Sequence, residues 1–356
     1  MFSNVSRALK TIAGFAFFNG GLLAIPGKIV RMYRREGVAG FRRLYRAAYS
    51  GDAVSRPGPN RPRDRDDYAF EVPFRYVVRQ PQVNCCAVIH VFYPDMAGLI
   101  RKYLENVPTG LDVYISTTSE EKKASIAAQF AGYGKGRVEL RVFHNRGRDI
   151  APKLVGFADV YERYDYVLSL HTKKSPHGGD MLAPWRDYLY EHLLGSPEIV
   201  KSIFELLRHD GVGMVFPQHF FPLRNHLKWG ENYDRTRALL ARMGTDLRDD
   251  VFLELPSGSM FWARTEALRP LLDLQLGFDD FDEEQGQIDG TLAHAVERAF
   301  LYALEGAGYT WAKVVLPHLY PLPQTIIPVN SPETIQSEFS RVHRLMLARP
   351  YRRSGA

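Results

Sequence analysis

The chain has 356 residues and a formal net charge of +6, and that charge is distributed unevenly. The first 66 residues hold thirteen Lys and Arg against four Asp and Glu, so they carry +9 and the remainder carries −3. A nearly neutral body argues against nucleic acid as its partner, whereas the basic N-terminal segment suits an anionic membrane surface. The length predicts a main domain of roughly 200–250 residues with additional elements.

The N-terminal segment, residues 1–50, is predicted to associate with a membrane. Residues 11–27 are uncharged and mostly apolar, but these 17 residues are few for a span, which needs about 20. Residues 28–49 interleave Arg with apolar side chains, which is typical of an amphipathic helix in a membrane interface. A helix packed on the body is the alternative, and whether residues 11–27 span or lie on the membrane stays open.

The cellular location follows from the same segment and from the cysteines. Cys85 and Cys86 are adjacent, and two vicinal cysteines form no disulfide framework, which fits a reducing compartment. We therefore expect a cytoplasmic protein that is peripheral on the inner face of the cytoplasmic membrane.

Residues 51–83 begin with a stretch rich in Pro, Gly and charge, and we interpret them as a linker. A domain is predicted over residues 84–322, followed by a C-terminal extension at 323–356. Its strands are predicted at 86–92, 112–117, 138–143, 166–170, 213–217 and 257–264. Its helices are predicted at 97–106, 120–130, 185–194, 198–208 and 291–303, with another in the extension from about 332. Strands alternating with helices predict an α/β fold with a mostly parallel central sheet flanked by helices.

Polar groups follow two of the predicted strands. The first group forms the turn after residues 138–143 and comprises Asn145, Arg146, Gly147, Arg148 and Asp149. The second follows residues 166–170 and comprises His171, Thr172, Lys173 and Lys174. Because open α/β sheets bind ligands at the carboxyl ends of their strands, both groups are expected to line one site. Guanidinium groups suit phosphate, and solvated basic loops are the alternative for both groups.

Other candidates lie at predicted helix starts. Asp95 follows the first strand of the domain and is either a ligand contact or the N-cap of the next helix. Asp289 precedes the helix at 291–303 and is either its cap or a general base. His294 and Arg298 share one face of that helix, and a buried core histidine is the alternative for His294.

The motifs HVFYPD, DVYIST, NRGRDIAP, LHTKKSPH, SGSMFWAR and DGTLAHAVER occur in this order along the chain. Together they resemble the rhamnan synthesis protein F family over roughly residues 84–310. The family is implicated in building rhamnose-containing bacterial polysaccharides, such as cell-surface lipopolysaccharide or capsule. The resemblance therefore implies a role in polysaccharide synthesis.

The chain is more loosely similar to family 2 glycosyltransferases of the GT-A fold. In those enzymes a turn of the type N-x-G before an alanine-bearing helix contacts the nucleotide, and here Asn145, Gly147 and Ala151 match it. A metal-holding Asp-x-Asp ends a later strand there, whereas His171 and Lys173 occupy that place here. The resemblance therefore implies no certain cofactor, and a divalent Mg²⁺ or Mn²⁺ ion stays an open alternative.

The resemblance implies an inverting glycosyltransferase. An acceptor hydroxyl, deprotonated by Asp289 or Glu284, would attack the anomeric carbon opposite the leaving nucleoside diphosphate. The donor, by family label dTDP-L-rhamnose, would contact Asp95, Asn145, Arg146, Gly147, Arg148, Asp149, His171, Lys173 and Lys174. The acceptor, a lipid-linked glycan, would contact Trp185, Arg186, Ser259, Trp262, His294 and Arg298.

A second function belongs to another class. Because the Asp-x-Asp is missing, the chain could instead be a non-catalytic subunit of a polysaccharide assembly complex that binds a glycan or a nucleotide. Transfer or hydrolysis of a nucleotide sugar by the purified protein distinguishes the two. The partners expected in either case are small molecules and the membrane surface, with no nucleic acid.

Overall fold

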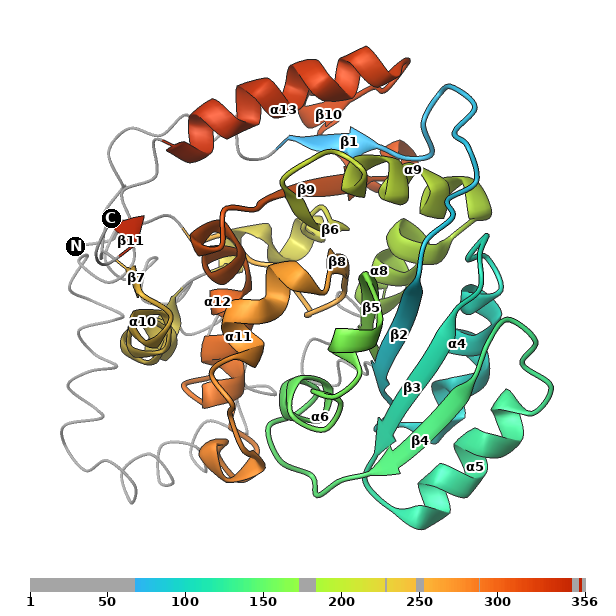
Figure 1. The fold of residues 1–356 in the computed structure, drawn as a ribbon, viewed down its shortest axis with the longest axis vertical. Coiled ribbons are helices and arrows are strands. Elements are labelled where there is room, and N and C mark those ends of the chain that lie inside the picture. Colours follow the sequence, from blue (N-terminus) through green and yellow to red (C-terminus); the bar gives the residue numbers. More distant parts are fainter. Residues whose placement is uncertain are drawn as a thin grey trace, which may run out of the picture. The chain divides into compact units, whose positions relative to one another are not determined.

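A computed structural model describes residues 68–172, 184–227, 229–247, 253–287, 289–347 and 352–353. The chain divides into two compact units, one made of Met1–Arg61 with Lys174–Trp185 and the other of Pro62–Lys173 with Arg186–Ala356. The second unit contains the sheet (Figure 1). The predicted membrane-associating arm at 1–50, with Lys173 and Lys174, lies outside the described residues.

In the described part of the chain, nine strands form one sheet in the order β10-β1-β9-β6-β8-β5-β2-β3-β4 (Figure 1). They are β1 Ala69–Glu71, β2 Cys85–His90, β3 Asp112–Thr117, β4 Val138–Val142, β5 Tyr166–His171, β6 Val212–Pro217, β8 Phe261–Arg264, β9 Thr310–Val315 and β10 Ile326–Ile327. Only β8 runs against its neighbours, β5 and β6. The sheet is therefore mostly parallel, as predicted. A separate pair joins β7 Thr245–Asp246 to β11 Arg352–Arg353.

Helices flank this sheet (Figure 1). They are α4 Ala97–Leu104, α5 Glu120–Phe130, α6 Ile150–Leu154, α8 Trp185–Leu194, α9 Pro197–Leu207, α10 Tyr233–Arg242, α11 Arg269–Leu272, α12 Leu292–Gly306 and α13 Pro332–Leu347. The short 3-10 turns are η2 Pro94–Met96, η3 Tyr161–Arg163, η4 Phe221–His226, η5 Gly230–Asn232, η6 Glu266–Leu268, η7 Phe278–Asp280, η8 Pro317–Leu319 and η9 Pro323–Thr325. Within the described residues, no helix is both long enough and apolar enough to cross a bilayer.

Side-chain alternation along β8 shows how the two faces are covered. Phe261 and Ala263 belong to the buried cluster that includes α12, and the Phe261 ring lies 5.1 Å from that of Phe300. Trp262, between them, packs against Phe204 of α9 with ring centroids 4.9 Å apart. Successive residues of a strand point to opposite faces, so α12 and α9 cover opposite faces of the sheet.

Two differences from the predicted organisation involve the sheet. The segment interpreted as a linker, 51–83, contains β1, which pairs with β9 and β10. The segment interpreted as an extension, 323–356, contains β10. β1 and β10 are too short to show a periodic pattern. A further strand, β9, was also not predicted, because Lys313 interrupts its apolar run.

The strand predicted at 257–264 is shorter in the structure, since β8 begins at Phe261. Residues Gly258 and Ser259 have φ angles of +85° and +52°, and these left-handed conformations form a turn before the strand. This turn lies at the edge of the sheet where the parallel strands end, because β8 runs antiparallel to them.

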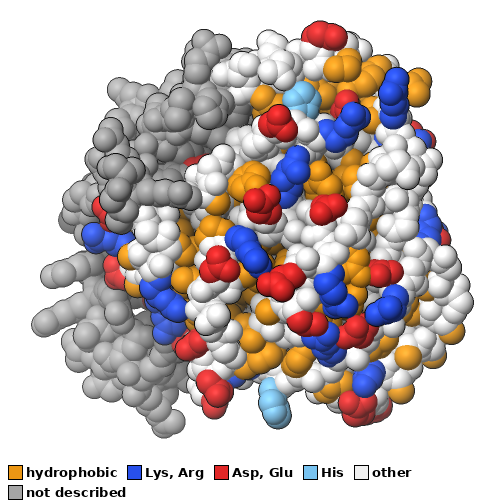
Figure 2. Space-filling model, in the orientation of Figure 1, with side chains coloured by type: hydrophobic (Ala, Val, Ile, Leu, Met, Phe, Trp, Pro, Cys, Tyr) orange, Lys and Arg blue, Asp and Glu red, His pale blue; other side chains and the backbone are white. Residues whose placement is uncertain are grey.

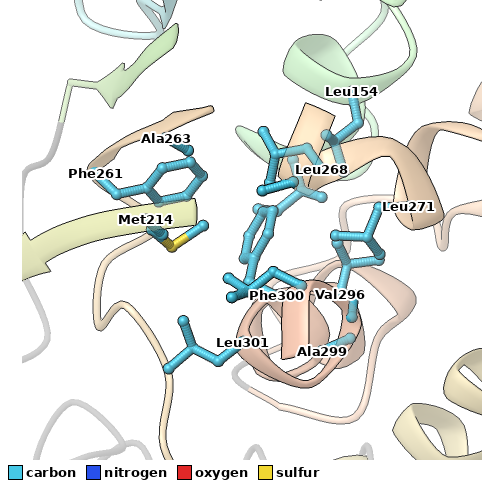
Figure 3. Close-up of a cluster of buried hydrophobic side chains, with 14 of the residues drawn as sticks. Leu154, Met214, Phe261, Ala263, Leu268, Leu271, Val296, Ala299, Phe300 and Leu301 are labelled. Atoms are coloured by element: carbon cyan, nitrogen blue, oxygen red, sulfur yellow. The ribbon is translucent and has the colours of Figure 1, made fainter. Parts of the chain in front are cut away.

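Phe300 is one of several aromatic side chains in the core on the α12 side. Phe300 is 1% exposed and lies among Phe261, Leu268 and Val296, as Figure 3 shows. Replacing a buried Phe with Ala removes its transfer free energy and leaves a cavity.

We therefore expect Phe300→Ala to lower the free energy of unfolding by about 3–5 kcal/mol. Phe300→Leu, which keeps most of the volume, should cost less than about 1.5 kcal/mol. Urea unfolding followed by circular dichroism measures both. An alanine variant as stable as the leucine variant would contradict this account of the core.

Candidate functional site

The carboxyl ends of β2, β5 and β6 lie at the same edge of the sheet, since these strands run parallel. His90 ends β2 and His171 ends β5, and the two residues are paired in register. The tip of β5 is tied to its neighbours: Thr172 accepts hydrogen bonds from the backbone of Phe92 and Tyr93, at 3.0 and 3.1 Å. The Tyr190 hydroxyl of α8 donates to the His171 carbonyl at 2.8 Å. These bonds fix the strand tip.

The turn after β4 meets the tip of β5, as the sequence predicted. Asp149 Oδ2 lies 3.2 Å from His171 Nδ1 and 2.7 Å from Lys153 Nζ. The Lys153 side chain is 2% exposed and that of Asp149 is 16% exposed. An acidic, a basic and an imidazole side chain thus form one cluster at the edge of the sheet.

The side chains of His171 and Lys153 stabilise the ionised form of Asp149. Burial by itself would raise the pKa of Asp149, but the charges and hydrogen bonds of His171 and Lys153 lower it well below its usual range. Asp149 is therefore an ionised carboxylate at neutral pH, and it balances the positive charge of Lys153.

His90 is the uncharged neighbour of this cluster. The Ser116 hydroxyl donates to the Ile89 carbonyl at 3.4 Å, so it accepts the hydrogen bond from His90 Nδ1 at 2.9 Å. Burial lowers the pKa of His90 to about 3, so the ring is neutral at physiological pH.

The turn at 145–149 is bound to an acidic segment, residues 279–289, which lies more than 130 residues away in the sequence. Arg146 Nε donates to the Phe281 carbonyl at 2.7 Å, and Nη1 donates to Asp279 at 2.8 Å. Gly147 has a φ of +69°, and a Cβ atom there would lie 2.7 Å from the Phe281 ring. Only glycine fits at this position without displacing Phe281. Arg146 therefore fastens this turn, and its guanidinium is engaged by protein atoms.

Glu284 is a carboxylate of the acidic segment that contacts the turn at 145–149. Its Oε1 accepts a hydrogen bond from the backbone of Arg148 at 3.1 Å, and its Oε2 lies 3.9 Å from Arg148 Nε. Burial raises the pKa of Glu284, and the nearby Asp149 charge acts in the same direction, whereas Arg148 lowers it. Two neighbouring carboxyl groups thus have pKa values moved in opposite directions, the arrangement found where acid and base roles are divided.

Asp289 is held by a different turn. Its carboxylate accepts hydrogen bonds from the Asn232 amide and from the backbone of Glu231, the latter at 3.2 Å, and it lies 3.5 Å from Arg298. Thr291, rather than Asp289, is the N-cap of α12. The capping alternative for Asp289 is therefore wrong, and the residue joins η5 to α12.

His294 belongs to the start of α12. Its Nδ1 lies 2.7 Å from the Thr291 hydroxyl, and the two residues form a reciprocal cap. Burial lowers the pKa of His294 to about 4. The alternative of a buried, hydrogen-bonded histidine describes it better than a contact with an acceptor. Arg298 donates to the His294 carbonyl at 3.0 Å, so both side chains are engaged within the helix.

Three of the residues predicted to contact the acceptor are bonded to other protein atoms. Trp262 is fully buried and its indole N–H donates to the Leu193 carbonyl at 3.4 Å, so its prediction as an acceptor contact is wrong. Ser259 is 2% exposed, and its carbonyl is bonded by Lys153 and Ser169. Arg186 pairs with its neighbour Asp187 at 2.6 Å.

Three predicted residues lie nearer the surface. Asp95 is exposed in η2 and does not cap α4, whose N-cap residue is Met96. Asn145 is exposed in the turn after β4, and Trp185, the first residue of α8, is partly exposed.

Two groups of buried polar residues were missed by the sequence analysis. Lys153 and Ser169 complete the cluster around Asp149. A second cluster follows β6, where His219 Nε2 lies 2.5 Å from Glu254 and Nδ1 lies 3.1 Å from the Ser257 hydroxyl. Lys313 Nζ lies 3.3 Å from Glu254. The only sequence signal was a charged residue inside an apolar run, such as Lys313 in β9.

Among the residues that the structure describes, no three His, Cys, Asp or Glu side chains are grouped as ligands of one ion. The cation nearest to Asp149 is the Lys153 ammonium, at 2.7 Å.

Asp149→Asn is expected to lower the free energy of unfolding by about 3–5 kcal/mol, because it leaves the buried Lys153 ammonium without its counter-charge. Asp279→Asn is the matched control: Asp279 is fully exposed in its ion pair with Arg146, so its loss should cost less than about 1 kcal/mol. Denaturant unfolding at pH 7 measures both. Equal costs would show that the cluster is not a buried ion pair.

Stability should also depend on pH through His90. Its pKa is about 3 in the folded state and near 6.5 in the unfolded state, so only the unfolded state binds a proton between these values. The free energy of unfolding therefore falls as the pH decreases from about 6.5 to about 3, by about 1.4 kcal/mol per pH unit for this group. His90→Gln should reduce the slope of the unfolding free energy against pH by the contribution of one proton, about 1.4 kcal/mol per pH unit. Urea unfolding at several pH values measures this slope. An unchanged slope would contradict the assignment.

Comparison with known proteins identifies the family to which the chain belongs. The chain is 40% identical over 229 residues to "Uncharacterized protein WxcX" of Xanthomonas campestris pv. campestris strain B100, and equally to the same protein of strain ATCC 33913. The match covers 64% of this chain and 32% of each relative, so the chain spans about a third of their length. Residues 66–309 match the family described as Rhamnan synthesis protein F. This match includes the turn at 145–149, the tip of β5 and the acidic segment, and the chain therefore belongs to the rhamnan synthesis protein F family.

Proposed function

We propose that this chain is a glycosyltransferase that transfers a deoxyhexose, with dTDP-L-rhamnose as the expected donor, during synthesis of a bacterial surface polysaccharide. The observation that carries the proposal is the contact between Asp149 and His171. It joins the turn after β4 to the tip of β5 at the carboxyl edge of a parallel sheet, in a chain of this family. Ligands of open α/β sheets bind at this edge.

The nucleotide diphosphate is expected to meet this edge through hydrogen-bond donors. Among the residues that the structure describes, His171 and Arg148 are the candidate donors. Lys173 and Lys174 are further candidates, and they lie outside the described residues. Arg146 contributes indirectly, because its guanidinium holds the turn against Asp279 and Phe281. Fixed donors of this kind offset the charge that develops on a leaving diphosphate. Asn145, exposed beside them, remains a candidate for the nucleotide.

Glu284 is the better of the two proposed general bases. Its burial raises its pKa toward neutral pH, where a base is most effective, and it lies in the segment that contacts the turn after β4. Asp289 is engaged by Asn232, by the Glu231 backbone and by Arg298. In the inverting reaction, the acceptor hydroxyl gives its proton to Glu284 and its oxygen bonds to the anomeric carbon. The bond from that carbon to the diphosphate breaks, and the nucleoside diphosphate leaves with the electron pair.

The acceptor and the location belong to the same proposal. A lipid-linked glycan would be presented at the inner face of the cytoplasmic membrane, to which the basic segment at 1–50 would bind. On the face drawn in Figure 2, acidic and basic side chains are interspersed over the described part of the protein. By sequence, the net positive charge is concentrated in the N-terminal segment.

A screen of nucleotide sugars tests the proposal directly. The donor should raise the melting temperature of the purified protein, since a ligand at about 100 times its Kd adds about 2.7 kcal/mol to stability. Release of the nucleoside diphosphate should follow, and repeating the assay in EDTA decides whether an added Mg²⁺ or Mn²⁺ ion is needed. Donor binding with no release or transfer, with or without metal, would favour the non-catalytic binding subunit.

Glu284→Gln should reduce the rate of transfer by about 10²–10⁴, the range for loss of a general base, with little change in donor affinity. Glu283→Gln is the matched control, because Glu283 is adjacent and exposed. Steady-state kinetics of nucleoside diphosphate release measure both variants. Full activity in Glu284→Gln combined with loss in Asp289→Asn would instead assign the base to Asp289.

A further inference from the structure

Lys153 is a buried lysine in the middle of the proposed site, and nothing in the sequence motifs assigns it a role. Its side chain is 2% exposed. An ammonium group removed from water is costly unless ion pairs and hydrogen bonds replace its hydration. Lys153 Nζ has such partners: Asp149 Oδ2 at 2.7 Å, the Ser169 hydroxyl at 2.9 Å and the Ser259 carbonyl at 3.1 Å.

These partners belong to three different elements. Asp149 is the N-cap residue of α6, Ser169 lies within β5, and Ser259 lies in the turn before β8. Ser169 also donates to the Ser259 carbonyl at 3.0 Å, so two donors share this acceptor. The Ser259 backbone has a φ of +52°, which is unusual for a residue with a side chain. Lys153 thus fixes the positions of α6, β5 and this turn relative to one another.

One carboxylate oxygen connects Lys153 to His171. Asp149 Oδ2 is the atom that lies near both Lys153 Nζ and His171 Nδ1. An ionised Asp149 can only accept, so we infer that the ring nitrogen nearest to it, Nδ1 at 3.2 Å, carries a proton. A ring with Nδ1–H directed at a carboxylate meets a ligand through its other nitrogen, Nε2, which donates to an anion only when the ring also carries the second proton.

We propose that Lys153 is a positioning residue, which holds Asp149 ionised and directed at His171, so that the His171 ring, protonated at both nitrogens, presents Nε2–H to an anionic ligand. The identity of the ligand rests on the proposed function, which makes it the diphosphate of a nucleotide sugar. Lys153 does not contact the ligand itself and acts through Asp149. The positive charge that orders the tip of β5 is therefore the ammonium group of Lys153.

A purely structural role is the competing explanation, because Lys153 also joins α6, β5 and the turn before β8. The two explanations differ in their dependence on Asp149. If Lys153 acts on His171 through Asp149, its removal should have no further effect on donor binding once Asp149 is gone. If Lys153 only joins the three elements, it keeps its bonds to Ser169 and Ser259 in Asp149→Asn, so its removal should weaken donor binding further in that variant.

The first experiment is a double-mutant cycle on donor binding. The variants are Lys153→Met, Asp149→Asn and the two combined, with Lys123→Met as the matched control, since the Lys123 side chain is 38% exposed and pairs with Glu120 at 3.4 Å. Lys153→Met should weaken dTDP-L-rhamnose binding about tenfold or more, and the control should not. The combined variant should bind within about twofold of Asp149→Asn, because the losses are not additive. Additive losses would overturn the proposal.

The second experiment does not depend on the ligand. NMR of the ¹⁵N-labelled full chain should show a His171 Nδ1–H proton bonded to Asp149, identified by its disappearance in His171→Gln. This resonance should shift or disappear in Lys153→Met and persist in Lys123→Met. An unchanged resonance in folded Lys153→Met would overturn the proposal. If Lys153→Met does not fold, Lys153→Gln, which retains a hydrogen-bond donor without the charge, is measured in its place with the same expectations.

The two experiments separate the two proposals. If the wild-type chain binds no nucleotide sugar, the proposed function fails, and the His171 resonance alone then decides the role of Lys153. If the wild-type chain binds and transfers the sugar but the resonance is the same without Lys153, the proposed function stands and the positioning role fails.

Discussion

The carboxyl edge of the sheet depends on one buried ion pair, between Lys153 and Asp149 at 2.7 Å. Removing two charges from water is costly, and the attraction between them offsets this cost only when further hydrogen bonds complete both groups. Ser169 and the Ser259 carbonyl supply them for Lys153, and His171 Nδ1 lies 3.2 Å from the same Asp149 oxygen that Lys153 contacts. The strand tips, the turn before β8 and the first turn of α6 are therefore organised around a single charge pair.

The fold was largely predictable because its strands and helices have strong local patterns. The bounds predicted for β3, α5 and α8 agree with the structure to the residue. The meeting of the turn after β4 with the tip of β5 also followed from topology, because parallel strands end at the same edge. β1 and β10 were not predictable, since strands of two or three residues leave no periodic pattern.

The candidate site was less predictable, because its contacts join distant segments. Arg146 appears in the sequence as a phosphate-binding residue, but its partners Asp279 and Phe281 are more than 130 residues away. Asp289 resembles a helix cap, and only the structure shows its amide partner, Asn232. Lys153 in a short amphipathic segment resembles a solvated side chain, and no local signal indicates that it is buried. Charged residues are the ones for which the sequence leaves burial undetermined.

The position of β1 has a consequence for dissecting the protein. β1 pairs with β9 and β10, at 310–315 and 326–327, both of which follow the last residue of the family match, 309. A fragment trimmed to the matched segment would lack both partners of β1 and would leave one side of β6 unpaired. Exposed strand edges promote association between chains. The boundaries of the cooperative folding unit therefore extend past those of the family resemblance, to at least residue 327.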